Sequence, residues 1–138
     1  MGARKRLRMK IGFTGTQKGM SLNQKINLAF HLGYYDAHEL HHGDCIGADE
    51  EADKIVSELD LEIVIHPPIK WAKRAFCDGP KHTILEPKEY LARNKDIVDA
   101  TDLLIAAPFT DEEELRSGTW STVRYARKMG KEVIILKR

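Results

Sequence analysis

Four short apolar runs and one brief mixed segment alternate with longer segments in which apolar residues recur at helical spacing. The segments that predict strands are residues 9–13, 39–42, 61–65, 102–106 and 133–136. The segments that predict helices are residues 21–33, 48–59, 87–99 and 118–129. The run 102–106 is nearly all apolar, as expected of a central strand buried on both faces. Residues 69–86 have no clear period and predict a long loop.

Local chemistry marks the limits of these helices. Ser21, with Gln24 three residues later, has the capping-box pattern that starts a helix. Pro87 suits the first position of the third helix. One face of the first helix carries Ile26, Ala29, Phe30 and Gly33, and the last of these suits its end. The third helix has an apolar stripe of Tyr90, Leu91, Ile97 and Val98, with Asn94 inside it. A buried amide at that position needs a partner, which is either a neighbouring loop or a ligand.

Alternating strands and helices predict an α/β fold, a three-layer, Rossmann-like, doubly wound parallel sheet. With about five strands we expect the order 3-2-1-4-5, so that the order reverses beside the first strand. A ligand crevice then lies between the turns after strands one and four, at the carboxyl edge of the sheet. We expect one domain over residues 1–138, with a basic tail at residues 1–8.

The first candidate site is the segment 41–53, where a glycine-bearing turn joins the second strand to a helix. Gly43 and Gly47 would let a ligand approach the main chain closely. Free amide N–H groups at the start of that helix would favour phosphate or another anion. Asp44 and Asp49 flank the turn and are the candidate catalytic carboxylates.

The other candidate ligand-binding residues come from two further turns and one helix. Gly15 and Thr16 follow the first strand, and the hydroxyl of Thr16 could bind a ribose or a phosphate. Arg93 and Asn94 lie on the third helix. A second anion site is predicted where the last helix begins, at Arg116, Ser117, Gly118 and Thr119.

Charge and composition narrow the classes of function. The chain has 22 Lys and Arg against 21 Asp and Glu, so its net charge of +1 indicates neither nucleic acid nor an anionic membrane as partner. The basic run of Arg4, Lys5, Arg6, Arg8 and Lys10 makes nucleic acid a secondary expectation. No apolar run could span a bilayer, and the two cysteines fit no secreted pattern, so we expect a cytoplasmic protein.

The chain carries no Walker lysine and no three-glycine dinucleotide fingerprint, and we expect no cofactor. His38, His41, His42 and Cys45 invite a zinc interpretation. However, alternation along a strand places His41 and His42 on opposite faces, and no second ligand pair follows. We therefore expect no metal.

These segments together resemble the SLOG superfamily, which includes the DprA/Smf proteins, the LOG phosphoribohydrolases and small YspA-type relatives. The resemblance rests on residues 12–16, 42–49, 93–94 and 117–120, and their order is most similar to the YspA-type proteins. It implies a Rossmann-like sheet with a cleft for a nucleotide or a nucleotide-derived small molecule. We also expect a homo-oligomer.

Two departures from the family patterns bear on activity. LOG enzymes carry Pro-Gly-Gly-x-Gly-Thr-x-x-Glu, and alignment on Gly118 and Thr119 places Thr122 at the glutamate. This disfavours cleavage of the N-glycosidic bond of a nucleoside monophosphate, which is the main alternative function. A third hypothesis is a DprA-like module for single-stranded DNA, although the additional domains of DprA proteins are absent from these residues.

Overall fold

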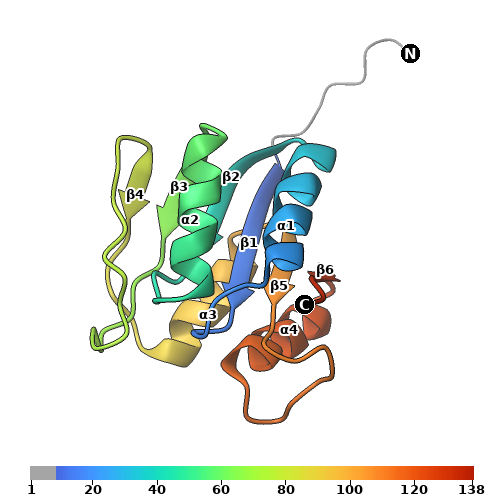
Figure 1. The fold of residues 1–138 in the computed structure, drawn as a ribbon. Coiled ribbons are helices and arrows are strands. Elements are labelled where there is room, and N and C mark those ends of the chain that lie inside the picture. The colour runs from blue at the N-terminus through green and yellow to red at the C-terminus, as the bar shows by residue number, and fades with distance from the viewer. Residues whose placement is uncertain (1–8) are drawn as a thin grey trace.

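The computed structural model describes residues 9–138, which form six strands and four helices (Figure 1). In chain order they are β1 (Met9–Gly15), α1 (Leu22–Tyr34), β2 (Ala37–His42), α2 (Ala48–Glu58), β3 (Glu62–Ile65), β4 (His82–Ile84), α3 (Tyr90–Asp99), β5 (Leu103–Ala107), α4 (Gly118–Lys128) and β6 (Glu132–Ile135). The basic tail predicted at residues 1–8 lies outside the described residues.

The six strands form one parallel sheet in the order β4-β3-β2-β1-β5-β6. The predicted doubly wound fold is therefore confirmed, and the order reverses beside β1 as expected. The number of strands differs, because β4 adds an edge strand next to β3 within the stretch predicted as a loop. It is only three residues long and largely exposed, so no apolar run marks it in the sequence.

Apolar side chains fill both faces of the sheet. In β5, Leu103, Ile105 and Ala107 pack in the core shared with α1 and α2. The alternate residues Leu104 and Ala106 pack with α3 and α4 on the other face. Each of these five residues is at most 1% exposed, which confirms that this central strand is buried on both sides.

The predicted face of α1 is turned outward, which corrects the sequence interpretation. The residues that pack inward are Gln24, Leu28 and Leu32, whereas Ile26 and Phe30 are 58% and 60% exposed. Both faces have helical spacing, so periodicity alone does not choose between them. The predicted capping box is present at Ser21, but the helix continues past Gly33 to Tyr34.

The loop after β1 is fixed between its two neighbours at the carboxyl edge of the sheet. The amide of Thr16 donates to the carbonyl of Ala107 at 3.0 Å, and its own carbonyl accepts from the amide of Ala48 at 2.9 Å. Gly47 is required where the loop meets α2, because it has φ +89° and an added Cβ would collide with the main chain of Gln17. The loop therefore covers the start of α2.

We predict that Gly47→Ala lowers the free energy of unfolding by about 1–3 kcal/mol, because the left-handed backbone and the collision with Gln17 both oppose a side chain. Gly118→Ala is the control, since a Cβ there meets nothing within 4 Å. Chemical denaturation measures both variants. Equal stability of Gly47→Ala and the wild type would contradict this account of the loop.

Candidate functional site

A cleft of about 760 Å³ opens at the carboxyl edge of the sheet, bounded by the loops after β1 and β5 and by the starts of α3 and α4. Eight of the ten predicted ligand-binding residues line it, namely Gly15, Thr16, Arg93, Asn94, Arg116, Ser117, Gly118 and Thr119. Gly43 and Gly47 are not among the lining residues. The position of the cleft matches the reversal of strand order beside β1.

The start of α4 offers backbone donors to the cleft. Ser117 caps the helix by accepting a hydrogen bond from the amide of Trp120 at 3.2 Å. Gly118 and Thr119 follow the cap, and amides at these positions have no acceptor within a helix. An added Cβ at Gly118 meets nothing within 4 Å, so a ligand has room to reach this backbone.

The start of α2 is different, which corrects the prediction of an anion site there. The amide of Ala48 is already bonded to Thr16, and the loop that supplies this carbonyl lies over Gly47. The first turn of α2 also carries the acidic residues Asp49, Glu50 and Glu51, which would disfavour a bound anion. Of the two predicted anion sites, only the one at α4 is open.

Among the charged side chains that line the cleft, cations outnumber carboxylates. Lys18 and Lys73 join Arg93 and Arg116, and the lining set has one carboxylate, that of Glu114. Lys18 lies over the ring of Phe109, with Nζ 4.2 Å from its centre. Within residues 9–138, Lys18, Lys73 and Arg116 form no ion pair, so their charges are available to a ligand.

Sequence reasoning missed the two lysines, although both stand in loops at the carboxyl edge. Lys18 follows the turn at Gly15 and Thr16, and this proximity is the signal that could have indicated it. Lys73 belongs to the long segment between β3 and β4, and only the folded loop brings it to the cleft.

Arg93 is buried, with 3% exposure, and joins α3 to the ends of β2 and β3. Its guanidinium donates to the carbonyls of Gly43 and His66 and to Oδ1 of Asn94, the last at 2.7 Å. A side chain at Gly43 would occupy the place of this guanidinium. Gly43 is therefore required for the approach of Arg93 rather than for the approach of a ligand.

Asn94 has one end of its amide fixed and the other free. Its Oδ1 holds Arg93, while its NH₂ group has no acceptor among residues 9–138. The predicted stripe on α3 was wrong in part, because Tyr90 and Leu91 are 44% and 66% exposed. The buried face of α3 instead combines Arg93, Ile97 and Val98.

The two candidate catalytic carboxylates lie beneath the cleft and do not line it. Asp44 is fully buried, and its carboxylate accepts from Nε of Arg74 at 2.7 Å and from the amide of Cys77 at 2.9 Å. Asp49 accepts from the amide of Cys45 at 3.2 Å, and burial raises the pKa of its carboxyl. Both groups are placed to hold loops together.

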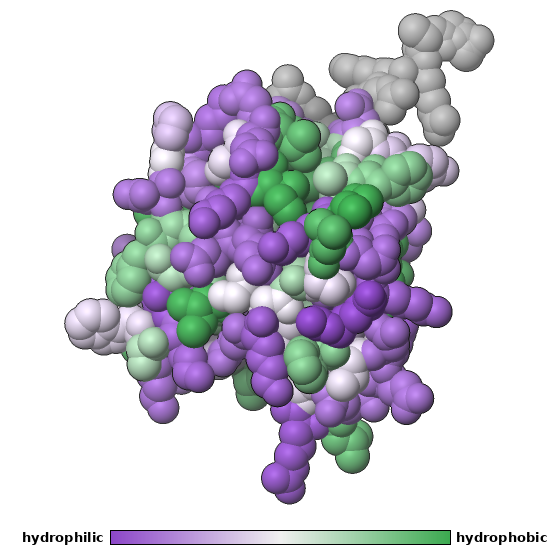
Figure 2. All heavy atoms as spheres, in the orientation of Figure 1, coloured by the Kyte–Doolittle hydropathy of each residue, from purple (hydrophilic) through white to green (hydrophobic). Residues whose placement is uncertain are grey.

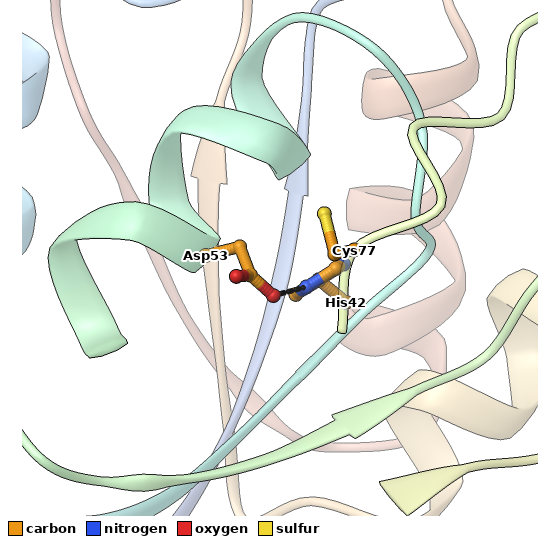
Figure 3. Close-up of side chains that lie close together, drawn as sticks. All are labelled: His42, Asp53 and Cys77. Atoms are coloured by element: carbon orange, nitrogen blue, oxygen red, sulfur yellow. Dashed lines mark hydrogen bonds and ion pairs between the residues drawn. The ribbon is translucent and has the colours of Figure 1, made fainter. Parts of the chain in front are cut away.

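His42 and Asp53, which are buried, and the half-buried Cys77 bring their metal-ligating atoms within 4.8 Å of one another (Figure 3). Nδ1 of His42 accepts the amide proton of Asp44 at 2.9 Å, so the ring carries its proton on Nε2 and donates to Asp53 at 2.8 Å. His82 contacts the same carboxylate at 2.9 Å. A cation on Nε2 would displace the proton to Nδ1, against the amide of Asp44. The geometry therefore suits a hydrogen-bonded carboxylate better than a metal centre.

A second histidine pair lies on the other side of β2. Nδ1 of His41 is 2.8 Å from Nε2 of His66, and its Nε2 is 2.5 Å from the carboxylate of Glu39. Burial, together with the neighbouring His41, lowers the pKa of His66 to about 4. Burial also lowers the pKa of His41.

Comparison with known proteins finds solved structures of the same fold but no matching family model and no matching curated protein. The molybdenum cofactor binding protein of Rippkaea orientalis aligns with a TM-score of 0.70 and 21% identity, over 95% of this chain and 77% of that one. The Moco carrier protein of Chlamydomonas reinhardtii aligns with a TM-score of 0.64 and 21% identity, over 94% of this chain and 76% of that one. DNA processing protein A of Helicobacter pylori, which binds single-stranded DNA, aligns with a TM-score of 0.63 and 19% identity. The alignment covers 92% of this chain and 64% of that one.

These alignments show that the chain has a Rossmann-like α/β fold. No helix in residues 9–138 combines the length and apolar character needed to cross a bilayer.

The His41–His66 pair predicts a loss of stability in mild acid. An unfolded histidine takes up a proton near pH 6.5, whereas folded His66 does so only near pH 4. Stability is therefore full above about pH 6.5 and is lost as the pH falls toward 4, by up to about 1.4 kcal/mol per pH unit for one such group. Urea denaturation over this range measures the slope. We expect a smaller slope in His66→Gln, and an unchanged slope would contradict the assignment.

Proposed function

We propose that the chain is a SLOG-type domain that binds a nucleotide or a nucleotide-derived small molecule through its phosphate in the cleft at α4. The observation that carries this proposal is the uncovered backbone at Gly118, in a cleft that is also lined by Lys18, Lys73 and Arg116, which form no ion pair within residues 9–138. A helix start supplies N–H donors and a partial positive charge, which together favour phosphate.

The remaining cleft walls fit the rest of such a ligand. Tyr90 and Phe109 offer aromatic surface, while Thr16 and Asn94 offer a hydroxyl and an amide. Pockets of this kind combine apolar walls with a few polar groups that fix orientation. The structural neighbours that bind the molybdenum cofactor or single-stranded DNA support an anionic ligand, because they share this fold.

We favour binding over N-glycosidic cleavage because Thr122 occupies the position that aligns with the LOG glutamate. This residue is buried, and its hydroxyl donates to the carbonyl of Gly118 at 3.0 Å, so no titratable group occupies the position of the LOG glutamate. Glu114 is the one carboxylate among the lining residues, and it is exposed on the loop after β5. A general acid or base must be a titratable group within reach of the reacting atom. We therefore expect no base release from AMP, GMP, CMP or UMP, even with Asp44 and Asp49 intact.

Gly118→Asp tests the phosphate site directly. The carboxylate would stand where the phosphate belongs, so calorimetric affinity for the four ribonucleoside monophosphates and for inorganic phosphate should fall at least tenfold, or about 1.4 kcal/mol. Gly118→Ala is the matched control, because its methyl group enters open space and adds no charge. Unchanged affinity in Gly118→Asp would move the phosphate site elsewhere.

Asn94 separates a tethering role from contact with the ligand. Asn94→Asp keeps the acceptor for Nε of Arg93 but replaces the NH₂ donors with a carboxylate oxygen. We expect its melting temperature to stay near that of the wild type while affinity for the same nucleotides falls. Asn94→Ala removes both the acceptor for Arg93 and the NH₂ donors. It should therefore lower both the melting temperature and the nucleotide affinity, and the affinity more strongly. A loss of stability alone in both variants would count against a contact with the ligand.

A further inference from the structure

Helix α1 is apolar on two opposite sides, and only one of them packs against the sheet. The outward side carries Leu22, Ile26, Phe30 and Tyr34, which are 73%, 58%, 60% and 69% exposed. Figure 2 shows apolar surface over α1. An apolar stripe on a helix normally packs against other protein, so the outward stripe of α1 has the composition of a covered surface.

The spacing of these residues gives the outward side a regular shape. They recur at every fourth position and form one ridge along the helix, with Phe30 stacked on Tyr34 at a ring separation of 6.0 Å. On a helix a groove lies between neighbouring ridges of this kind, and here the next row carries the small residues Ala29 and Gly33. A Cβ added at Gly33 meets nothing within 4 Å, so the space beside it is open.

A ridge beside a groove is self-complementary. When two copies of α1 cross, the ridge of each can enter the groove of the other, which is the commonest way that helices pack in globular proteins. A two-fold axis through the crossing uses the same surface on both copies and closes the assembly at two chains.

The scarcity of charged residues on α1 also favours a second copy of this chain, rather than a charged protein, as the partner of this surface. Helix α1 contains no acidic residue, and its one lysine, Lys25, is 3.5 Å from the carboxylate of Glu51. The neighbouring polar residues Asn23 and Asn27 are uncharged and hydrogen-bonded within the chain. Two copies of this surface therefore meet without opposing like charges.

The available area suits the centre of a dimer interface. A stable interface covers about 800 Å² on each partner, and a buried aromatic side chain contributes roughly 150–250 Å². Phe30, Tyr34, Leu22 and Ile26 expose more than half of their area, which supplies on the order of half of that total.

From this ridge and groove we infer that the protein forms a two-fold homodimer through α1. None of the four ridge residues lines the cleft, so dimer formation and ligand binding are separable properties.

The test is the mass of the protein in solution by sedimentation equilibrium at concentrations up to about 100 μM. We expect a dimer in the wild type and at least a tenfold weaker dimer in Phe30→Lys. Gly33→Gln is the sharper variant, because its side chain has room in the monomer and is a better helix former, yet fills the groove that the partner ridge needs. It should therefore lose the dimer without losing thermal stability as a monomer.

Leu91→Lys is the matched control, since Leu91 is a 66% exposed apolar residue on a different helix. It should leave the dimer intact. A wild-type monomer throughout the concentration range would overturn the inference. So would a dimer that survives both Phe30→Lys and Gly33→Gln, or one that Leu91→Lys disrupts to the same extent.

Discussion

The buried guanidinium of Arg93 is the interaction on which the carboxyl edge of the sheet depends. A charge buried to 3% exposure is tolerated only when its donors are satisfied, and here carbonyls at Gly43 and His66 and the amide oxygen of Asn94 accept from it. The same guanidinium lies over the ring of Tyr90, 4.6 Å from its centre. The arginine thus joins α3 to β2 and β3 and orients Asn94 at the wall of the cleft.

With that edge fixed, the two helix starts that face it acquire different roles. The loop after β1 gives its carbonyl at Thr16 to the start of α2, so the first amide of that helix is used inside the protein. The start of α4 has only its own cap at Ser117 and keeps open space at Gly118. Lys18 and Lys73 line the same cleft as the open start at Gly118 and add positive charge to it. Occupancy by the chain itself, rather than the glycine pattern, decides where an anion can bind.

The sequence predicted the fold well, because alternation of strands and helices restricts a parallel sheet to few topologies. It predicted the cleft for the same reason, since the ends of parallel strands meet at one edge. It did not predict which residues contact one another within the fold. Gly43 accommodates the side chain of Arg93, and Asp44 accepts from the backbone amide of Cys77, so both depend on residues more than thirty positions away. The outward face of α1, with Phe30, was misassigned because two apolar stripes on one helix have the same period.

An NMR titration of ¹⁵N-labelled protein with inorganic phosphate, and then with a ribonucleoside monophosphate, tests the central claim most directly. Gly118 and Thr119 line the cleft at the first positions of α4, where amides have no acceptor within the helix, so their resonances should shift first and furthest. The amide of Ala48, already bonded to Thr16, should shift little. Shifts that centre on Ala48 and leave Gly118 unchanged would contradict a phosphate site at the start of α4.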